Sequence, residues 1–216
     1  MIRIVAVSGY KNSGKTTLCR KLLHELGSLG VCTGYIKRTS DEVVSDRVTD
    51  TGSVAEMGIG AVLWGRDGLR YEMPANEEIS PQYIASRYFP DSELLIIEGG
   101  KSLMLPKIWV STEGEDPPSY PGIFMIYDRH GNKEGRMVYR SGEEKQMACR
   151  LASLVRGKAY RSSKIYFGDT PLPMKDFIAD FVRGSIMGML ASLKGGKATD
   201  KTIRIYIDGN TEGRKG

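Results

Sequence analysis

The chain has 216 residues, of which 40% are hydrophobic and 26% are charged, and its formal net charge is +5. These values are typical of a globular protein with one substantial domain, with or without a small appendage, and they exclude a disordered chain. No apolar run approaches the roughly 20 residues that span a bilayer, so we expect no membrane insertion.

Composition excludes several further kinds of chemistry. The three cysteines (Cys19, Cys32 and Cys149) are widely spaced, which argues against a disulfide framework and against C-x-x-C metal spacing. Two histidines are too few for a histidine-based metal site or triad. Lysines and arginines are spread without a dense basic block, which argues against nucleic acid as a partner. Because a strand pattern starts at the second residue, without a leader-like segment, we expect a cytoplasmic protein.

The N-terminal segment predicts a strand, a loop and a helix. A β-branched run covers residues 2–7, and leucines recur at helical spacing within 17–29. Between them, Gly9–Thr16 fits the phosphate-loop pattern G-x-x-x-x-G-K-[ST]. The strand and the helix on either side are the context that this pattern requires.

The rest of the chain alternates between the two kinds of element. Further strands are predicted at 31–37, 61–64, 69–73, 94–97, 108–110, 123–127, 137–139, 164–167 and 203–207. Further helices are predicted at 49–60 (weakly), 80–88, 143–156 and 177–193. The segments 61–64 and 69–73 form a hairpin pattern around a Gly-bounded turn.

This alternation predicts an α/β fold of the P-loop NTPase class, in which helices cover both faces of a mostly parallel central sheet. We expect a nucleotide-binding domain at 1–160. A small C-terminal βαβ extension is expected at 161–208, packed on or beside the main sheet, and a solvated tail at 209–216.

The loop residues are suited to binding phosphates. Glycines allow the backbone to turn so that successive N–H groups face an anion, and the following helix adds the positive end of its dipole. Lys15 supplies a charge for the β- and γ-phosphates, Thr16 a hydroxyl for Mg²⁺ and Thr17 a contact to the α-phosphate. Lys11 either adds charge over the phosphates or points to solvent. The candidate nucleotide-binding segment is Gly9, Tyr10, Lys11, Asn12, Ser13, Gly14, Lys15, Thr16 and Thr17.

Acidic residues provide the second part of the candidate site. The apolar strand 94–97 ends in Glu98, where a carboxylate would emerge beside the phosphate loop and hold a metal ion or its water. Gly99 would let a backbone N–H approach the terminal phosphate. Asp46 and Asp50, in the polar stretch after the second strand, are candidates for binding Mg²⁺ or for positioning a nucleophile. Lys37, at the end of the second strand, is a further candidate ligand-binding residue.

Taken together, these segments resemble the MobB family of molybdopterin-guanine dinucleotide biosynthesis adapter proteins, over roughly residues 1–160. The resemblance is carried by the segments Gly9–Thr17, Tyr35–Lys37, the acidic loop, Ile97–Lys101 and Leu105–Ile108. It implies GTP binding with Mg²⁺, a weak GTPase and a homodimer. The candidate catalytic residues, taken from the motifs above, are Lys15, Glu98 and Asp50. The resemblance also implies an accessory role in attaching GMP to molybdopterin, beside a separate nucleotidyltransferase and in contact with molybdopterin or its dinucleotide.

The chain departs from the family pattern at a few positions, and other functions stay open. Arg38 follows Lys37 where relatives often have histidines, and Gly100 stands where an aromatic residue is usual. The guanine-reading pattern Asn-Lys-x-Asp is incomplete at 132–135, so GTP rests on the resemblance and ATP stays open. A small-molecule kinase, a dethiobiotin-synthetase-like ligase and a noncatalytic nucleotide-binding module are the alternatives. No glutamine or arginine stands out as an activator, so hydrolysis should be slow.

Overall fold

The computed structural model describes residues 2–75, 78–112, 120–131, 135, 137–155, 163–168, 170–193, 203–205 and 207. The chain divides into two compact units, and we describe each by itself. The first comprises Met1–Ala159 and Ile165–Pro173, and the second comprises Tyr160–Lys164 and Met174–Gly216. The predicted domain boundaries at residues 160 and 208 stay predictions.

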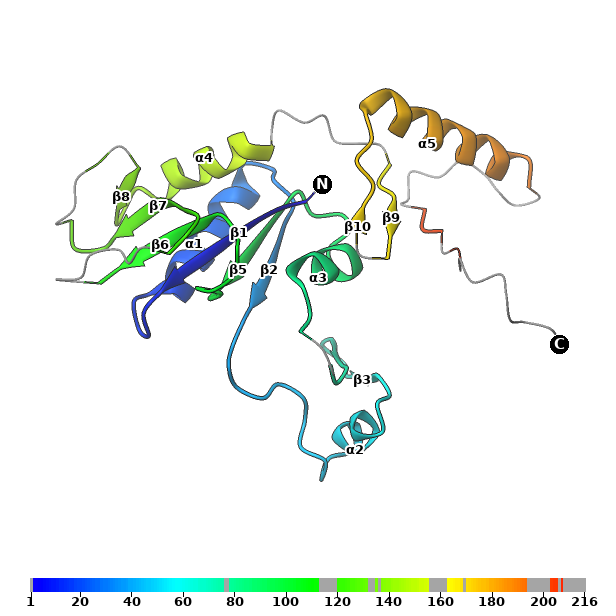
Figure 1. The fold of residues 1–216 in the computed structure, drawn as a ribbon, viewed down its shortest axis with the longest axis horizontal. Helices are drawn as coiled ribbons and strands as arrows, with labels where there is room; N and C mark the ends of the chain where they lie inside the picture. The colour runs from blue at the N-terminus through cyan, green and yellow to red at the C-terminus, as the bar shows by residue number, and fades with distance from the viewer. Residues whose placement is uncertain are drawn as a thin grey trace. The chain divides into compact units, whose positions relative to one another are not determined.

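A six-stranded sheet forms the centre of the first unit (Figure 1). Its strands are β1 (Arg3–Gly9), β2 (Thr33–Lys37), β5 (Leu94–Glu98), β6 (Lys107–Ser111), β7 (Ile123–Asp128) and β8 (Val138–Arg140). They lie in the order β2-β5-β1-β6-β7-β8, and every neighbouring pair is parallel. All residues of β5 and β6 are buried, as their continuous apolar runs indicate. The predicted parallel α/β sheet is therefore confirmed.

Helices cover both faces of this sheet, as predicted. On one face α1 (Lys15–Ser28) and α4 (Glu144–Val155) bury Leu22 and Leu151 against alternate residues of β1, β5 and β6. On the other face α3 (Pro81–Tyr88) packs Ala85 against Leu95. The helix α3 begins as its sequence indicates, with Pro81 at its first position and the Ser80 hydroxyl accepting a hydrogen bond from Tyr83 N at 3.0 Å.

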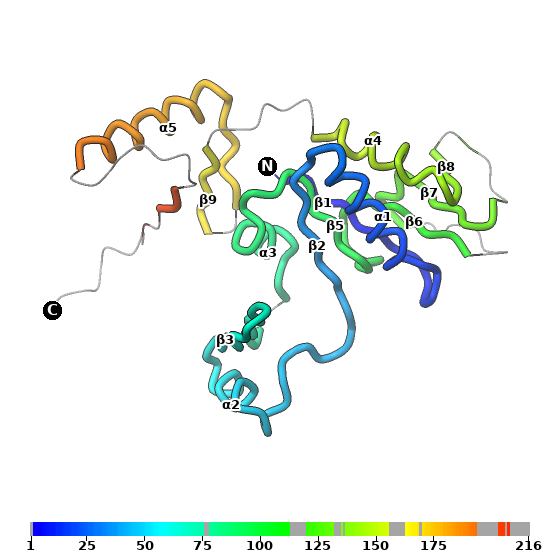
Figure 2. The backbone as a smooth tube through the Cα atoms, turned by 180° about the vertical axis from the view of Figure 1, so that it is seen from behind, coloured from blue at the N-terminus to red at the C-terminus, as the bar shows by residue number. Residues whose placement is uncertain are grey.

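An insertion follows β2 and lies apart from the central sheet (Figure 2). It contains α2 (Asp50–Glu56) and the antiparallel hairpin of β3 (Ala61–Trp64) and β4 (Leu69–Glu72), which confirms the predicted hairpin. The buried Glu72 carboxylate ties the preceding loop to the hairpin, because it accepts hydrogen bonds from Ser45 N at 3.0 Å and from the Ser45 hydroxyl at 2.8 Å. The exposed large side chains of the hairpin are Val62, Leu63, Trp64, Leu69 and Tyr71.

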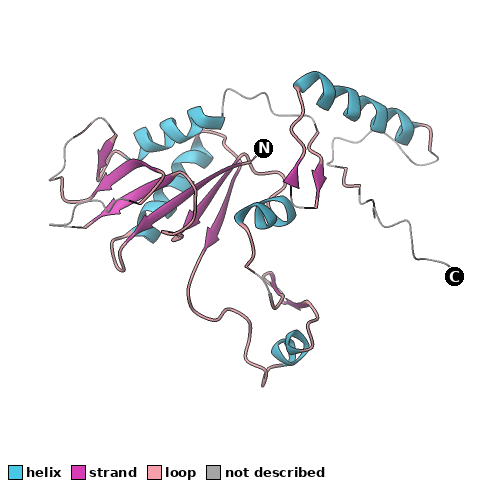
Figure 3. Cartoon of the chain, viewed as in Figure 1, coloured by secondary structure: helices cyan, strands magenta, loops and turns pink. Residues whose placement is uncertain are grey.

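The C-terminal part differs from the predicted βαβ arrangement (Figure 3). A short hairpin of β9 (Tyr166–Phe167) and β10 (Thr170–Pro171) precedes α5 (Asp176–Ala191). The strand predicted at 203–207 is not formed at the residues described there, 203–205 and 207. Alternating isoleucines favour a strand only where a neighbouring strand pairs with their backbone, and these isoleucines are all exposed. The predicted tail at 209–216 lies outside the described residues.

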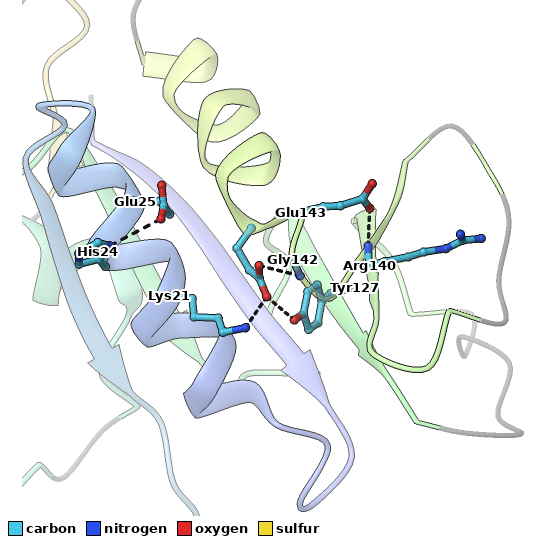
Figure 4. A network of polar contacts seen from close by, with 8 residues as sticks. Lys21, His24, Glu25, Tyr127, Arg140, Gly142 and Glu143 are labelled. Atoms are coloured by element: carbon cyan, nitrogen blue, oxygen red, sulfur yellow. Dashed lines mark hydrogen bonds and ion pairs between the residues drawn. The ribbon is translucent and has the colours of Figure 1, made fainter.

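A buried carboxylate at the start of α4 joins α4, α1 and β7. Glu144 Oε1 accepts hydrogen bonds from Lys21 Nζ at 2.6 Å and from the Tyr127 hydroxyl at 2.7 Å, and Glu144 Oε2 accepts one from Gly142 N at 2.9 Å. Figure 4 shows Lys21 and Tyr127 converging on this carboxylate. Burial alone would raise the pKa of Glu144, but the bonds from Lys21 and Tyr127 outweigh it and lower this pKa to about 2.

We predict that Glu144→Gln lowers the free energy of unfolding at neutral pH by about 1–3 kcal/mol, because charge-assisted hydrogen bonds are lost. The folded-state pKa lies below the ordinary value of 4.5, so this stabilisation is present above that pH and is lost as the pH falls toward 2. Denaturant unfolding at several pH values should show the gap between the two proteins closing over this range. The exposed Glu56→Gln is the control, and a gap that does not depend on pH contradicts the assignment.

Candidate functional site

The loop between β1 and α1 is folded tightly around its glycines. At Gly9 a Cβ atom would lie 2.8 Å from Val110 O and 2.7 Å from Ser13 Oγ, so a larger residue does not fit. Asn12 and Gly14 have φ angles of 62° and 93°, the left-handed conformation that turns the chain into the first helical N–H groups. The backbone of this segment therefore has the turns that a phosphate-binding loop requires.

Lys15 is folded back over this loop, where its ammonium donates a hydrogen bond to Tyr10 O. Burial lowers the pKa of Lys15, nearby Lys101 lowers it further, and Glu98 opposes both effects. The nitrogen of Lys15 therefore lies against the backbone of the loop, in a partly buried position.

Glu98 and Thr16 meet at the end of β5. The buried Glu98 carboxylate accepts hydrogen bonds from the Thr16 hydroxyl and from the Tyr35 hydroxyl, both at 2.6 Å. Burial and the bond to Glu98 raise the pKa of Tyr35, and burial followed by the Glu98 charge raises the pKa of Cys19 to about 12. Both Glu98 oxygens are therefore fixed by hydroxyl donors, and one of these donors belongs to the phosphate loop.

The hydroxyl of Thr16 and the carboxylate of Glu98 are the hard oxygen donors that Mg²⁺ prefers. Within the described ranges, no three His, Cys, Asp or Glu side chains gather into a group that could hold a metal ion by themselves. Mg²⁺ commonly takes one or two protein oxygens and completes its shell with water and substrate phosphates, so these two donors fit it.

The other predicted acidic residues lie elsewhere. Asp46 shapes the turn before α2, where its carboxylate accepts a hydrogen bond from Val48 N at 3.2 Å, and Asp50 is the exposed first residue of that helix. Within the described ranges, Asp46, Asp50 and Glu98 do not form a three-carboxylate group, so the metal and catalytic roles of the two aspartates stay predictions.

The remaining predicted residues lie at the end of β2 and at the loop between β1 and α1. Lys37 pairs in register with Glu98 at the carboxyl end of β2, and its side chain is exposed. Lys11 and Thr17 are exposed at the loop, while Ser13 is buried. Contact of these residues with a nucleotide stays a prediction.

The expected role of the Gly99 N–H is not seen. This group donates to Val7 O at 2.9 Å and continues the pairing of β1 with β5, while the Ser8 hydroxyl donates to Gly99 O at 2.7 Å. Glycine is required here because φ is 100° and because a Cβ atom would lie 2.9 Å from Arg38 O. Gly99 therefore turns the chain and does not present its N–H to a phosphate in this structure.

Two basic residues at the loop, Lys101 and Arg129, and a buried lysine at the start of β6, Lys107, were not predicted as site residues. Lys101 Nζ lies 4.6 Å from the centre of the Tyr10 ring, and Arg129 Nη1 lies 3.5 Å from Ser13 O. Fully buried Lys107 donates to the carbonyl oxygens of Leu103, Leu105 and Pro121. Lys101 could have been found from its place three residues after Glu98, whereas Arg129 gives no local signal because only the sheet order brings it to Ser13.

The parallel sheet and the glycine-rich loop between β1 and α1 define a P-loop NTPase fold. Solved structures agree: the crystal structure of molybdopterin-guanine biosynthesis protein B has a TM-score of 0.58 at 23% identity, and covers 70% of this chain and 99% of that one. The crystal structure of Bacillus subtilis MobB has a TM-score of 0.54 at 21% identity, with 73% and 100% covered. At these identities the similarity shows the fold.

The family model for molybdopterin guanine dinucleotide synthesis protein B matches residues 4–122, and the chain belongs to this MobB family. It is 30% identical over 135 residues to the molybdopterin-guanine dinucleotide biosynthesis adapter protein of Escherichia coli (strain K12), covering 60% of this chain and 75% of the relative. It is 26% identical to the putative adapter protein of Methanocaldococcus jannaschii, covering 96% and 98%. The second alignment extends past residue 160, so that relative shares sequence beyond the first domain.

We predict that Gly9→Ala lowers the free energy of unfolding by about 1–3 kcal/mol and weakens phosphate binding, because the new methyl group would overlap Val110 O. Thermal unfolding and calorimetric titration with a nucleotide measure the two effects. The matched control is Gly27→Ala in α1, where a methyl group meets no atom within 4 Å. This variant should be unchanged or more stable by up to about 1 kcal/mol. Equal behaviour of both variants contradicts the tight packing inferred for the loop.

Proposed function

We propose that this chain is a GTP-binding adapter that assists the attachment of GMP to molybdopterin. The observation that carries the proposal is the hydrogen bond of 2.6 Å between Thr16 and Glu98, beside a lysine folded over a glycine-rich loop. The family membership and the names of the relatives support the place of this site in molybdopterin-guanine dinucleotide synthesis.

In this proposal the loop N–H groups and Lys15 bind the phosphates, while Thr16 and Glu98 hold Mg²⁺. When bound, the ion would neutralise phosphate charge and orient the terminal phosphate. Both Glu98 oxygens already accept hydrogen bonds from hydroxyl groups, which favours a positioning role over proton abstraction. Hydrolysis should therefore be slow, and the bound nucleotide would act mainly as a signal to a partner.

The proposed partner is the molybdopterin-guanine nucleotidyltransferase, with molybdopterin or its dinucleotide as a further ligand. We also propose a homodimer, as the family resemblance implies. The hairpin β3–β4 supports an association surface because it exposes Leu63 and Trp64, and isolated two-stranded hairpins are only marginally stable in water. A solution mass equal to a single chain of 23.9 kDa at micromolar concentration contradicts the dimer.

None of the helices described here is both long and apolar enough to cross a membrane. The proposal places the protein in the cytoplasm. Cell fractionation tests this location, and recovery of the protein in the membrane pellet at high salt would contradict it.

Calorimetric titration with GTP and with ATP, each with Mg²⁺, tests nucleotide binding directly. We expect GTP to bind more tightly, and Lys15→Ala to weaken binding by about ten- to hundredfold because a charge-assisted contact is lost. The exposed Lys145→Ala removes the same charge from α4 and should leave binding unchanged. Tighter ATP binding would overturn the choice of base.

The same purified protein distinguishes an adapter from a true enzyme of this fold. Incubation with nucleotide and a panel of small-molecule acceptors should yield only slow hydrolysis. Rapid product formation without a partner would instead show a kinase or a dethiobiotin-synthetase-like ligase. If Lys15→Ala abolishes nucleotide binding but leaves cofactor maturation intact in cells, the nucleotide serves only to stabilise the fold.

A further inference from the structure

Two lysines converge on one residue of the phosphate loop. The Lys15 ammonium donates to the Tyr10 carbonyl oxygen, and the Lys101 ammonium lies over the Tyr10 ring, 4.6 Å from its centre. This second contact is within the range of a cation–π interaction. The two positive charges lie close enough to repel, since Lys101 is one of the groups that lower the pKa of Lys15.

The loop that carries Lys101 is firmly held. Gly99 N donates to Val7 O at 2.9 Å and Leu103 N donates to Gly100 O at 3.1 Å. Further along, the buried Lys107 ammonium binds the carbonyl oxygens of Leu103 and Leu105. The backbone on both sides of Lys101 is therefore anchored to the sheet, and its side chain is directed to the phosphate loop by a fixed support.

The charge of Lys101 is not neutralised by a carboxylate. Among the residues that the structure describes, it forms no ion pair, and its ammonium contacts the Tyr10 ring. A cation–π contact at a partly exposed site contributes only about 0.5–1 kcal/mol, so an anion of high charge would displace it. A cation held beside a phosphate loop by such a weak contact is available to a ligand.

We propose that Lys101 is a further phosphate-binding residue. When a nucleoside triphosphate binds, the Lys101 ammonium would move away from the Tyr10 ring and contact the terminal phosphate. This inference rests on the proposed function, because it requires a nucleotide at the loop. We assign Lys101 to the terminal phosphate because it lies three residues after Glu98. Glu98 accepts a hydrogen bond from Thr16, and these two residues are the proposed Mg²⁺ ligands. Lys15 would then be shared between the β- and γ-phosphates, with Lys101 contacting the γ-phosphate alone.

This arrangement distinguishes triphosphate from diphosphate. A diphosphate would leave Lys101 on the Tyr10 ring, whereas a triphosphate would draw it away. Because the backbone around Lys101 is held in place, only its side chain would differ between the two nucleotide states.

The test compares the dissociation constants of GTP, ATP and GDP, with Mg²⁺, for the full chain and for Lys101→Gln and Lys101→Ala. We expect triphosphate binding to weaken by about ten- to hundredfold and diphosphate binding by less than about threefold. Lys101→Arg should keep most of the preference for triphosphate because it keeps the charge. Lys145→Ala is the matched surface control, and melting temperatures verify that each variant is folded.

The two ways in which this test can fail are distinguishable. If the unmodified protein binds none of these nucleotides, the proposed function fails and this inference fails with it. If it binds them and the folded Lys101 variants lose triphosphate and diphosphate affinity equally, or lose neither, the role of Lys101 alone is overturned.

Discussion

The structure of the site depends on the carboxylate of Glu98 at the end of a buried strand. One of its oxygens accepts a hydrogen bond from Thr16 on α1 and the other from Tyr35 on β2, so a single side chain joins three elements. A buried carboxylate is costly unless its oxygens are paired, and these two hydroxyls supply the pairing. The result is a fixed acidic side chain beside a loop that Lys15, Lys101 and Arg129 also contact.

Beside this carboxylate, the ammonium group of Lys15 is held by a backbone carbonyl group, because it donates to Tyr10 O. A carbonyl dipole binds an ammonium group without cancelling its charge, so Lys15 keeps a positive charge to offer to an anion at the loop. Such a charge favours a polyanion, which agrees with the proposed binding of a magnesium nucleotide.

Most of the fold could be predicted from the sequence because its signals are local. The phosphate loop, the buried strand before Glu98 and the capped start of α3 each have a short pattern with one physical interpretation. The strand expected at 203–207 is not formed at the residues described there. Alternating apolar residues show that a segment is able to pair with a strand, but they do not show that a partner strand lies beside it. Asp46 and Asp50 were placed near the metal by their position in the sequence, whereas the hairpin that follows anchors their loop through Ser45 and Glu72.

The residues that sequence reasoning missed depend on tertiary structure. Arg129 follows β7, and only the order of the strands brings it to Ser13. Lys101 lies close to a predicted site residue, yet nothing in its neighbourhood shows that its side chain reaches Tyr10. The sequence position of Lys101, three residues after Glu98, was nevertheless a usable signal, whereas the sequence alone cannot distinguish Arg129 from an ordinary surface charge.

The most direct test of the proposed adapter role is whether the bound nucleotide controls association with the molybdopterin nucleotidyltransferase of the same cell. Binding of the two purified proteins should be measured by calorimetry with GTP, with GDP and without nucleotide, each in the presence of Mg²⁺. We expect affinities that differ by at least about tenfold between nucleotide states, with the difference lost in Thr16→Ala. Equal affinity in all three states, or no association, would contradict the adapter role.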